Sequence, residues 1–421
     1  MGDFYEFFAG GGMARAGLGG VWRCVFSNDF SAKKSECYTK NWGGDVHINA
    51  DVRSLKPKDL PGRANLVWAS FPCQDLSLAG NGAGLEGHRS GVFWPFWDLL
   101  NDLSKDGRAP DMIMLENVCG ALTSHDGQDF ASICAAFVRS GYRFGALVVD
   151  AVAFLPQSRA RLFILGVRSD IAPPKALVGE AASKLWHTNA VRSAQQSLDP
   201  KVRKNWIWWK LPAPPERTTT FAELIEDRPT SVKWHTVAET QKLLGMMSPI
   251  NAKKVEDAKR AGRRMVGAIY KRTRPDDAGC KVQRAEVRFD DVAGCLRTPA
   301  GGSSRQVIMV VDGQSIRSRL ISSRETARLM GLPDSYILPA KYNDAYHLTG
   351  DGVAVPVVAH LSKHLLEPLM RAFPAASGAI LAGPSLRAPA IEKSKLLARS
   401  PKRPASVVGE KLSRQLSTFK Y

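Results

Sequence analysis

The sequence predicts an α/β protein, with a largely parallel sheet from residue 1 to about residue 170 and a smaller, less regular region after it. Short apolar segments alternate with helical stretches over the first of these parts. From residue 171 to about 315, proline-rich breaks, an aromatic cluster and a basic run follow one another without a clean period. We therefore expect a sheet domain followed by a second domain that is mostly irregular or β.

Composition and charge restrict the class of protein. The chain has 421 residues, 44% of them hydrophobic, so it can bury the cores of two or three domains. No apolar run is long enough to span a membrane, and the first residues lack the features of a secretion signal. The formal net charge of +18 favours nucleic acid as a partner, although a basic balance alone can also serve solubility. We expect a cytoplasmic protein.

Six apolar segments are expected to form the strands of the sheet, because each is bounded by turn residues. They span residues 4–8, 24–27, 66–70, 112–116, 146–150 and 162–167. The carboxyl ends of parallel strands meet at one edge of a sheet, where ligands bind. Polar residues near these strand ends are therefore the first candidates for a functional site.

A cysteine follows the segment at residues 66–70. In the sequence Phe71-Pro72-Cys73, the proline fixes φ and removes a backbone donor, and the glycine-rich residues 80–87 are expected to close over a substrate. A thiol exposed there is suited to act as a nucleophile. Taken alone, the Pro-Cys pair is better explained by a buried, unreactive cysteine. The seven cysteines show no CxxC pairing, so neither a zinc site nor a disulfide framework is indicated.

The first two strands lead into residues suited to a nucleotide ligand. The glycine turn at residues 8–12 lets a ligand approach bare backbone, and Asp29 can bind ribose hydroxyls beside the aromatic face of Phe30. Asp51, after a third short segment, is placed to accept a hydrogen bond from an adenine amino group. A nicotinamide or flavin site and a purely structural turn are alternatives, and each acid alone is better explained as a loop or capping residue.

A carboxylate and two arginines occupy corresponding positions later in the sheet. Glu116 ends the fourth strand, and Gln157, Arg159 and Arg161 alternate along the chain ahead of the sixth, so they can point to one side. Strand ends in such a sheet face the crevice expected to hold Cys73. Singly, Glu116 is explained as a helix N-terminal charge and the arginines as solvated groups. Together, they favour a catalytic site.

The end of the chain combines helices with a polar tail. Helical order is expected at residues 323–330, where Ser323 and Glu325 mark the start, and again at 356–373. After about residue 377, too few large apolar residues are present for a packed unit, and a basic, disordered tail is expected. This tail either adds nonspecific affinity for phosphates or is a solvated appendage.

In order and spacing, these motifs resemble the cytosine-C5 DNA methyltransferases over residues 3 to about 373. The matching segments are Phe8-Ala9-Gly10-Gly11-Gly12, Pro72-Cys73-Gln74, Glu116-Asn117-Val118, Gln157-x-Arg159-x-Arg161, residues 324–333 and Gly350-Asp351-Gly352-Val353. The resemblance implies a Rossmann-like, S-adenosylmethionine-dependent methyltransferase sheet. It also implies a smaller, mostly irregular or β target-recognition domain across a DNA-binding cleft.

The resemblance also implies four regions of the chain. Residues 1–170 would be the catalytic and cofactor-binding domain, and 171–320 the target-recognition domain. Residues 321–376 would be a scaffold helix and the return to the catalytic domain, and 377–421 the tail.

The implied cofactor is S-adenosylmethionine. The resemblance places Phe8, Gly10 and Gly12 at its methionine part, Asp29 and Phe30 at ribose and adenine, and Asp51 with Val52 at the adenine edge; Pro72, Asp351 and Val353 complete the set. At one position the chain departs from the family, because the usual Gly-Asn is Gly350-Asp351 here. A carboxylate cannot donate the hydrogen bond that an amide donates, so the chemistry of this contact differs.

The implied reaction begins when the Cys73 thiolate adds to C6 of a cytosine flipped out of the duplex, which makes C5 able to attack the sulfonium methyl group. Glu116 would support the ring at N3 and the exocyclic amine, while Arg159 and Arg161 hold the O2 side. No metal is required. The residues expected to contact DNA are Gln74, Ser77, Gln157, Arg297 and Arg305.

The second domain has the composition expected of a DNA-reading unit. Its basic residues suit phosphate contact and guanine reading in the major groove, and the segment at residues 295–306 is expected to carry base contacts. These basic residues are Arg263, Arg264, Lys271, Arg272, Arg274, Arg284, Arg288 and Arg305. The tryptophans at positions 206, 208 and 209 are expected in the core of the small domain rather than as stacking platforms.

The function implied is sequence-specific DNA cytosine-5 methylation, in a restriction-modification system or as a solitary or phage modification enzyme. The expected partners are double-stranded DNA and a cognate restriction endonuclease acting on the same sequence, with a monomeric enzyme in the bacterial cytoplasm or nucleoid. An RNA (transfer RNA) cytosine-5 methyltransferase would carry the same motifs, but the large basic insert favours duplex DNA. The catalytic set argues against a silent DNA-binding module, and the Pro72-Cys73-Gln74 loop against a nucleotide-dependent oxidoreductase.

Overall fold

The structure is a computed structural model, and it describes residues 1–72, 90–275, 279–297 and 305–373. Met1–Pro374 forms one compact unit. The predicted site residues Cys73, Gln74 and Ser77 lie outside the described residues, as does the predicted tail. Among the described helices, none has the length and apolar character needed to cross a membrane.

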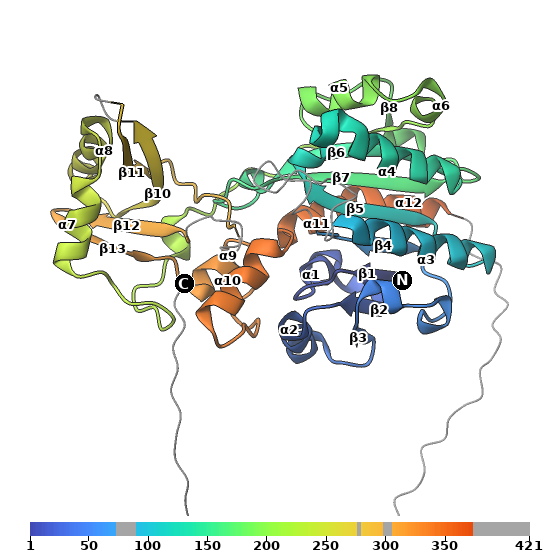
Figure 1. The fold of residues 1–421 in the computed structure, drawn as a ribbon, viewed down its shortest axis with the longest axis horizontal. Coiled ribbons are helices and arrows are strands. Elements are labelled where there is room, and N and C mark those ends of the chain that lie inside the picture. Colours follow the sequence, from blue (N-terminus) through green and yellow to red (C-terminus); the bar gives the residue numbers. More distant parts are fainter. Residues whose placement is uncertain (73–89, 276–278, 298–304, 374–421) are drawn as a thin grey trace, which may run out of the picture. The chain divides into compact units, whose positions relative to one another are not determined.

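A seven-stranded sheet is built from the part of the chain between Gly2 and Arg168 (Figure 1). Its strands are β1 (Gly2–Phe7), β2 (Trp22–Asp29), β3 (His47–Asn49), β4 (Leu66–Ala69), β5 (Met112–Val118), β6 (Tyr142–Asp150) and β7 (Ala160–Arg168), in the spatial order β3-β2-β1-β4-β5-β7-β6. Among these described strands, only the pairs of β7 with β5 and β6 are antiparallel. The predicted α/β class with a largely parallel sheet is therefore confirmed.

The central strands are apolar throughout because both faces of the sheet are covered. In β4, Leu66 and Trp68 enter one core, whereas Val67 and Ala69 enter the other. The first core is covered by α1 (Met13–Leu18), α2 (Ala32–Trp42), α11 (Val355–Leu361) and α12 (Glu367–Ala372); the second is covered by α3 (Phe93–Lys105) and α4 (Gln128–Arg139). Alternation of side chains along each strand thus fills two layers, which leaves the strand ends for polar groups.

The tryptophan cluster extends the core of the large sheet, so its predicted place in the core of the small domain is wrong. Trp206 packs edge-on against Phe144 of β6 at 5.4 Å, and the Trp209 indole donates a hydrogen bond to the Leu165 carbonyl. Gly145 permits this approach, because a Cβ there would clash with the Ile207 carbonyl. The elements around the cluster are β8 (Val178–Gly179), α5 (Asn189–Gln196), α6 (Pro200–Arg203) and β9 (Trp208–Trp209).

A second, antiparallel sheet of four strands follows in the order β11-β10-β12-β13. Its strands are β10 (Met265–Pro275), β11 (Lys281–Arg288), β12 (Val307–Asp312) and β13 (Ser315–Leu320). Two helices, α7 (Val237–Gly245) and α8 (Pro249–Arg260), pack on one face and bury Leu243 and Val255 with Met309. The expected separate β unit is present, and these two helices were not predicted.

The last described residues are helical, as predicted. Helix α9 (Ser323–Arg328) begins at residue 323, as expected, and its N-cap is the preceding residue, Ser322, which forms a capping box with Glu325. Helix α10 (Tyr342–Asp351) follows, and a π-helical turn (Ser362–Leu366) joins α11 to α12. The domain boundaries near residues 170, 320 and 376 stay a prediction.

Glu325 also forms a buried ion pair with Arg319, and both side chains are 0% exposed. We expect Glu325→Ala to lower the free energy of unfolding by about 3–5 kcal/mol, because it leaves the guanidinium group buried without its counter-charge. Urea unfolding measures this loss. Glu239→Ala is the matched control, since Glu239 closes the same kind of capping box on an exposed helix and its loss should cost far less. Equal losses in the two variants would contradict the prediction.

Candidate active site

The turn after β1 has one position open to a ligand and one that is closely packed. Phe8, Gly10 and Gly12 have φ values of 56°, 56° and 76°, in the left-handed region that favours glycine. A Cβ at Gly10 would meet nothing within 4 Å, whereas one at Gly12 would clash with the Trp42 indole. The backbone at Gly10 is therefore accessible to a ligand, while Gly12 is packed.

Two aromatic side chains hold this turn in place. The Gly11 carbonyl accepts hydrogen bonds from the Trp42 indole nitrogen at 3.0 Å and from the Tyr336 hydroxyl at 2.7 Å. Burial raises the pKa of Tyr336, so its hydroxyl stays protonated and donates. Neither residue was predicted from the sequence, because a tryptophan and a tyrosine at these positions are equally consistent with core packing.

Asp29 forms part of the turn, and Phe30 is exposed beside it. The Asp29 carboxylate is buried and accepts backbone hydrogen bonds from Gly10 and Ser31, both at 2.8 Å. Phe30 is 68% exposed, so its ring is accessible to a planar ligand. The structure thus brings Asp29, Phe30 and Gly10 together, as predicted from the strand ends.

The other predicted adenine contacts have structural roles in the described residues. Asp51 caps a single 3-10 turn (Val52–Ser54), and its carboxylate accepts from the Arg53 backbone N–H at 2.9 Å. Val52 is buried and packs with Leu55 in the second core. Asp51 remains partly exposed, and its contact with a cofactor stays a prediction.

Glu116 and Arg161 form a buried charged pair at the predicted strand edge. Pairing of β5 with β7 places Val118 opposite Arg161, and the Arg161 Nε lies 3.3 Å from the Glu116 Oε1. Burial raises the pKa of Glu116, while Arg161 and then Arg159 oppose this rise through their positive charges. A carboxyl group with a raised pKa is suited to sharing a proton with a substrate.

This pair contacts the described residues that precede Cys73. The Ser70 side chain hydrogen-bonds to Glu116, and the Asn117 amide donates to the Phe71 carbonyl at 3.2 Å. The segment leading to the cysteine is therefore attached directly to the strand that carries the carboxylate.

Both terminal nitrogen atoms of Arg159 donate hydrogen bonds to backbone carbonyls. One Nη donates to the Leu296 carbonyl at 3.1 Å, and the other donates to the carbonyls of Gly350 at 2.7 Å and Gly352 at 2.6 Å. Burial lowers the pKa of Arg159 to about 10. Its Nε is buried and lacks a hydrogen-bond partner among the described residues. Arg159 thus holds two chain segments, and Arg161 rather than Arg159 contacts Glu116.

Gln157 has a packing role, which does not suit the predicted contact with DNA. The side chain is 0% exposed; its amide nitrogen donates to the Leu329 carbonyl at 2.6 Å, and its oxygen accepts from the Leu296 N–H. A side chain with both polar atoms satisfied inside the protein has nothing left for a groove. We therefore leave it out of the proposed DNA contacts.

The remaining predicted residues lie around the second sheet and the chain return. Arg297 is exposed, and Arg305 donates to the Asn343 side chain at 3.1 and 2.6 Å. Val353 is buried in the first core. Asp351 pairs with Lys34 at 2.6 Å, and Lys34 was not predicted. The one feature of the sequence that could have indicated it is the carboxylate at position 351, because a carboxylate in this position favours a nearby cation.

Comparison with known proteins shows the family of the chain. The C-5 cytosine-specific DNA methylase family matches the chain over residues 2–367. The chain belongs to this family. It is therefore an enzyme, a DNA cytosine-5 methyltransferase, and the predicted resemblance is confirmed.

The methylase is similar to several bacterial enzymes over most of its length. Type II methyltransferase M.HpaII of Haemophilus parainfluenzae is 24% identical, over 87% of this chain and 89% of that protein. M.BsuFI of Bacillus subtilis is 26% identical over 88% and 73%, and a DNA-cytosine methyltransferase of Escherichia coli K12 is 27% identical over 87% and 78%.

Solved structures share the fold of the methylase. A Dnmt2 methyltransferase of S. pombe aligns with a TM-score of 0.53 at 17% identity, covering 88% of this chain and 99% of that one. The methyltransferase EhMeth of Entamoeba histolytica aligns with a TM-score of 0.55 at 14% identity, covering 88% and 98%. The predicted two-domain methyltransferase fold is thereby confirmed.

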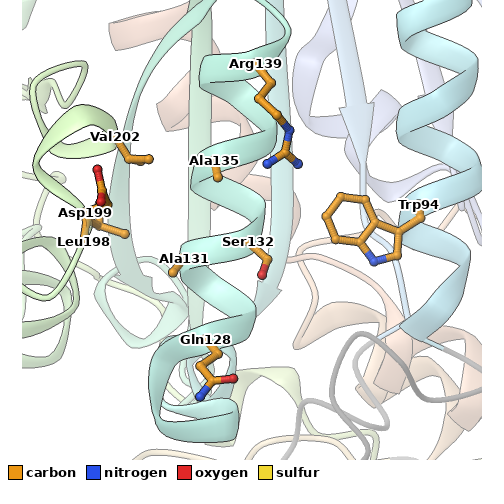
Figure 2. Close-up of a pocket in the computed structure, with 9 residues that line it drawn as sticks. All are labelled: Trp94, Gln128, Ala131, Ser132, Ala135, Arg139, Leu198, Asp199 and Val202. Atoms are coloured by element: carbon orange, nitrogen blue, oxygen red, sulfur yellow. The ribbon is translucent and has the colours of Figure 1, made fainter.

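A groove of about 430 Å³ lies away from these residues, along the outer face of α4 (Figure 2). Trp94 borders it on one side, Asp199 and Val202 border it on the other, and Ser132 and Arg139 of α4 form its floor. None of its lining residues is a predicted site residue. The groove lies over a helix rather than at the strand ends, so we do not place the reaction there.

Glu6, in β1 ahead of the glycine turn, gives the methylase a testable pH dependence. Burial raises its pKa from 4.5 to about 8, although the Arg15 backbone N–H and the Tyr38 hydroxyl donate to it. Between about pH 5 and 8 the folded state keeps a proton that the unfolded state releases, so stability should fall as pH rises, by at most about 1.4 kcal/mol per pH unit.

Glu6→Gln should reduce this fall, because the amide keeps an acceptor for Arg15 and cannot ionise. Urea unfolding of both proteins at pH 5, 6.5 and 8 measures the difference. Parallel curves for the two proteins would show that Glu6 does not bind the proton.

Proposed function

We propose that this methylase transfers a methyl group from S-adenosylmethionine to C5 of a cytosine flipped out of duplex DNA, through a Cys73 thiolate adduct at C6. Family membership and the names of its relatives support a DNA cytosine substrate rather than transfer RNA. The observation that carries the proposal is the buried pair of Glu116 and Arg161 beside Ser70, three residues ahead of Cys73.

The residues of the chain supply the steps around the cytosine ring. The Cys73 sulfur bonds to C6, the electrons of the C5–C6 double bond move toward C5 and N3, and Glu116 shares its proton with N3. When bound, S-adenosylmethionine supplies an electrophilic methyl group on a sulfonium centre. After C5 has taken the methyl group, solvent accepts the C5 proton, the proton shared at N3 returns to Glu116, and departure of Cys73 restores the aromatic ring and the thiolate.

Arg161 acts on the reaction indirectly, by positioning the Glu116 carboxyl group and changing its pKa. Its guanidinium orients the carboxyl group and limits the rise in pKa that burial causes. The same positive charge favours the thiolate form of a nearby cysteine. For Arg159, the buried Nε is the donor that remains for the O2 side of the base.

The glycine turn fits the proposed cofactor. The open backbone at Gly10, the exposed ring of Phe30 and the carboxylate of Asp29 form a site with a bare main chain, an aromatic face and an acceptor. The residues proposed to bind S-adenosylmethionine are Phe8, Gly10, Gly12, Asp29, Phe30, Asp51, Val52, Pro72, Asp351 and Val353.

The second sheet is the proposed reader of the DNA sequence. Arg297 is exposed and Arg305 lies close after it, so both flank residues 298–304, which fall outside the described residues. Gln74 and Ser77 are proposed to contact the flipped nucleotide. Because several relatives are named type II methyltransferases, we propose a role in modification against a cognate restriction endonuclease, in the bacterial cytoplasm.

Cys73→Ser should abolish methylation, because a serine hydroxyl is a far weaker nucleophile than a thiolate. Bisulfite sequencing of DNA from a methylation-free host expressing either protein measures this. Wild-type protein should protect one cytosine in a fixed short sequence, and the variant none. Methylation by the variant would exclude the proposed adduct, and an unmethylated host with soluble wild-type protein would exclude the proposed substrate.

Glu116→Gln should lower the rate of methyl transfer by about 10²- to 10⁴-fold, because the amide cannot share a proton with N3. Single-turnover transfer of labelled methyl groups to DNA measures the rate. Binding of S-adenosylhomocysteine should stay unchanged, since Glu116 contacts the segment before Cys73 rather than the glycine turn. A variant with the wild-type rate would remove Glu116 from the mechanism.

A further inference from the structure

Lys34 of α2 joins the end of α10 to the proposed cofactor site. Its Nζ lies 2.6 Å from the Asp351 Oδ2, with the two side chains 22% and 39% exposed. The pKa of Lys34 is raised, because the charges of Asp351 and Asp29 outweigh the effect of burial, which alone would lower it. Lys34 is therefore a protonated, half-buried cation near two carboxylates.

Both carboxylates lie at the glycine turn. Asp29 accepts a hydrogen bond from the Gly10 backbone N–H. The helix α10, which ends at Asp351, packs over the same turn. A Cβ on Gly11 would lie 3.1 Å from the Leu348 Cδ1, and Gly352 is packed against Met13. Lys34 is thus within electrostatic range of Asp29, which binds the Gly10 backbone, and its partner Asp351 ends the helix that packs over Gly11.

The position of Asp351 is fixed from both sides. The carbonyls of Gly350 and Gly352 both accept hydrogen bonds from Arg159, so the backbone around residue 351 is held by a buried guanidinium. Among the described residues, Lys34 is the hydrogen-bond partner of its carboxylate, and only Oδ2 is used. The Oδ1 therefore remains as an acceptor.

The pair offers both signs of charge at one place. Asp351 alone can only accept hydrogen bonds, and its charge would repel a ligand carboxylate. The Lys34 ammonium group neutralises this charge and has further N–H donors. An acceptor and a donor cation side by side match the ammonium and carboxylate groups of an α-amino acid.

We propose that Lys34 and Asp351 together recognise the amino-acid end of S-adenosylmethionine. The proposal rests on the proposed function and adds Lys34 to its cofactor site. The alternative is a purely structural ion pair between α2 and α10. The chain contains a matched control for that alternative, because Lys33 and Asp344 also join α2 to α10, with Nζ and Oδ1 2.9 Å apart.

The test compares two ligands on the full-length protein by titration calorimetry. S-adenosylhomocysteine carries the amino-acid end, and 5′-methylthioadenosine is the same nucleoside thioether without it. Lys34→Met should weaken binding of S-adenosylhomocysteine by about tenfold or more, the effect of a lost charged hydrogen bond. Binding of 5′-methylthioadenosine should change by less than about twofold, and Lys33→Met should affect neither ligand.

A double variant separates recognition from loss of folding. Lys34→Met leaves Asp351 uncompensated, so adding Asp351→Asn should recover much of the lost affinity for S-adenosylhomocysteine. Melting temperatures without ligand show whether each variant is folded. An equal loss for both ligands, an unchanged affinity in Lys34→Met, or no recovery in the double variant would overturn the proposal.

The same titrations distinguish this proposal from the proposed function. Wild-type protein that binds neither ligand would reject the cofactor site itself, and this proposal with it. Wild-type protein that binds S-adenosylhomocysteine with the same affinity as Lys34→Met would reject only the role of Lys34.

Discussion

The guanidinium group of Arg159 is the interaction on which the rest of the site depends. A buried charge needs hydrogen-bond partners, and here three carbonyls from residues 296, 350 and 352 accept from the two Nη atoms, which leaves only Nε without a partner among the described residues. Burial lowers the pKa of Arg159 to about 10, so the group stays charged at neutral pH and the bonds stay strong. Arg159 therefore positions both the approach to the second sheet and the return to the glycine turn.

The glycine turn has a similar dependence on distant parts of the chain. Its Gly11 carbonyl is held by Trp42 from α2 and by Tyr336, which lies 325 positions further along the sequence. Leu348 then packs over the same glycine. The backbone of the turn lies entirely between β1 and α2. Two of the side chains that hold it, Tyr336 and Leu348, come from the part of the chain around α10.

The sequence predicts much of the fold and less of the site. The central strands were predictable because a short, continuously apolar run such as residues 112–115 is typical of a parallel strand that is buried on both faces of the sheet. Helices α7 and α8 were missed because they bury few residues. Gln157 and Arg161 belong to the same alternating pattern in the sequence, yet one is fully buried between backbone groups and the other meets Glu116; only the packing decides this. Lys34 was missed because it is one of three lysines on α2, and the carboxylate at position 351 does not indicate which of them pairs with it.

Arg159 acts on the charges around both Glu116 and Asp351. Around Glu116, two arginines oppose the effect of burial, so the carboxyl group is neither a fixed anion nor permanently neutral. Around Asp351, the Lys34 ammonium group forms an ion pair with the carboxylate, at the position where the family usually has an amide. Arg159 contributes to both, through its charge on Glu116 and through its bonds around Asp351. Asp351 is therefore best understood together with Lys34 and Arg159 rather than as an isolated departure from the family.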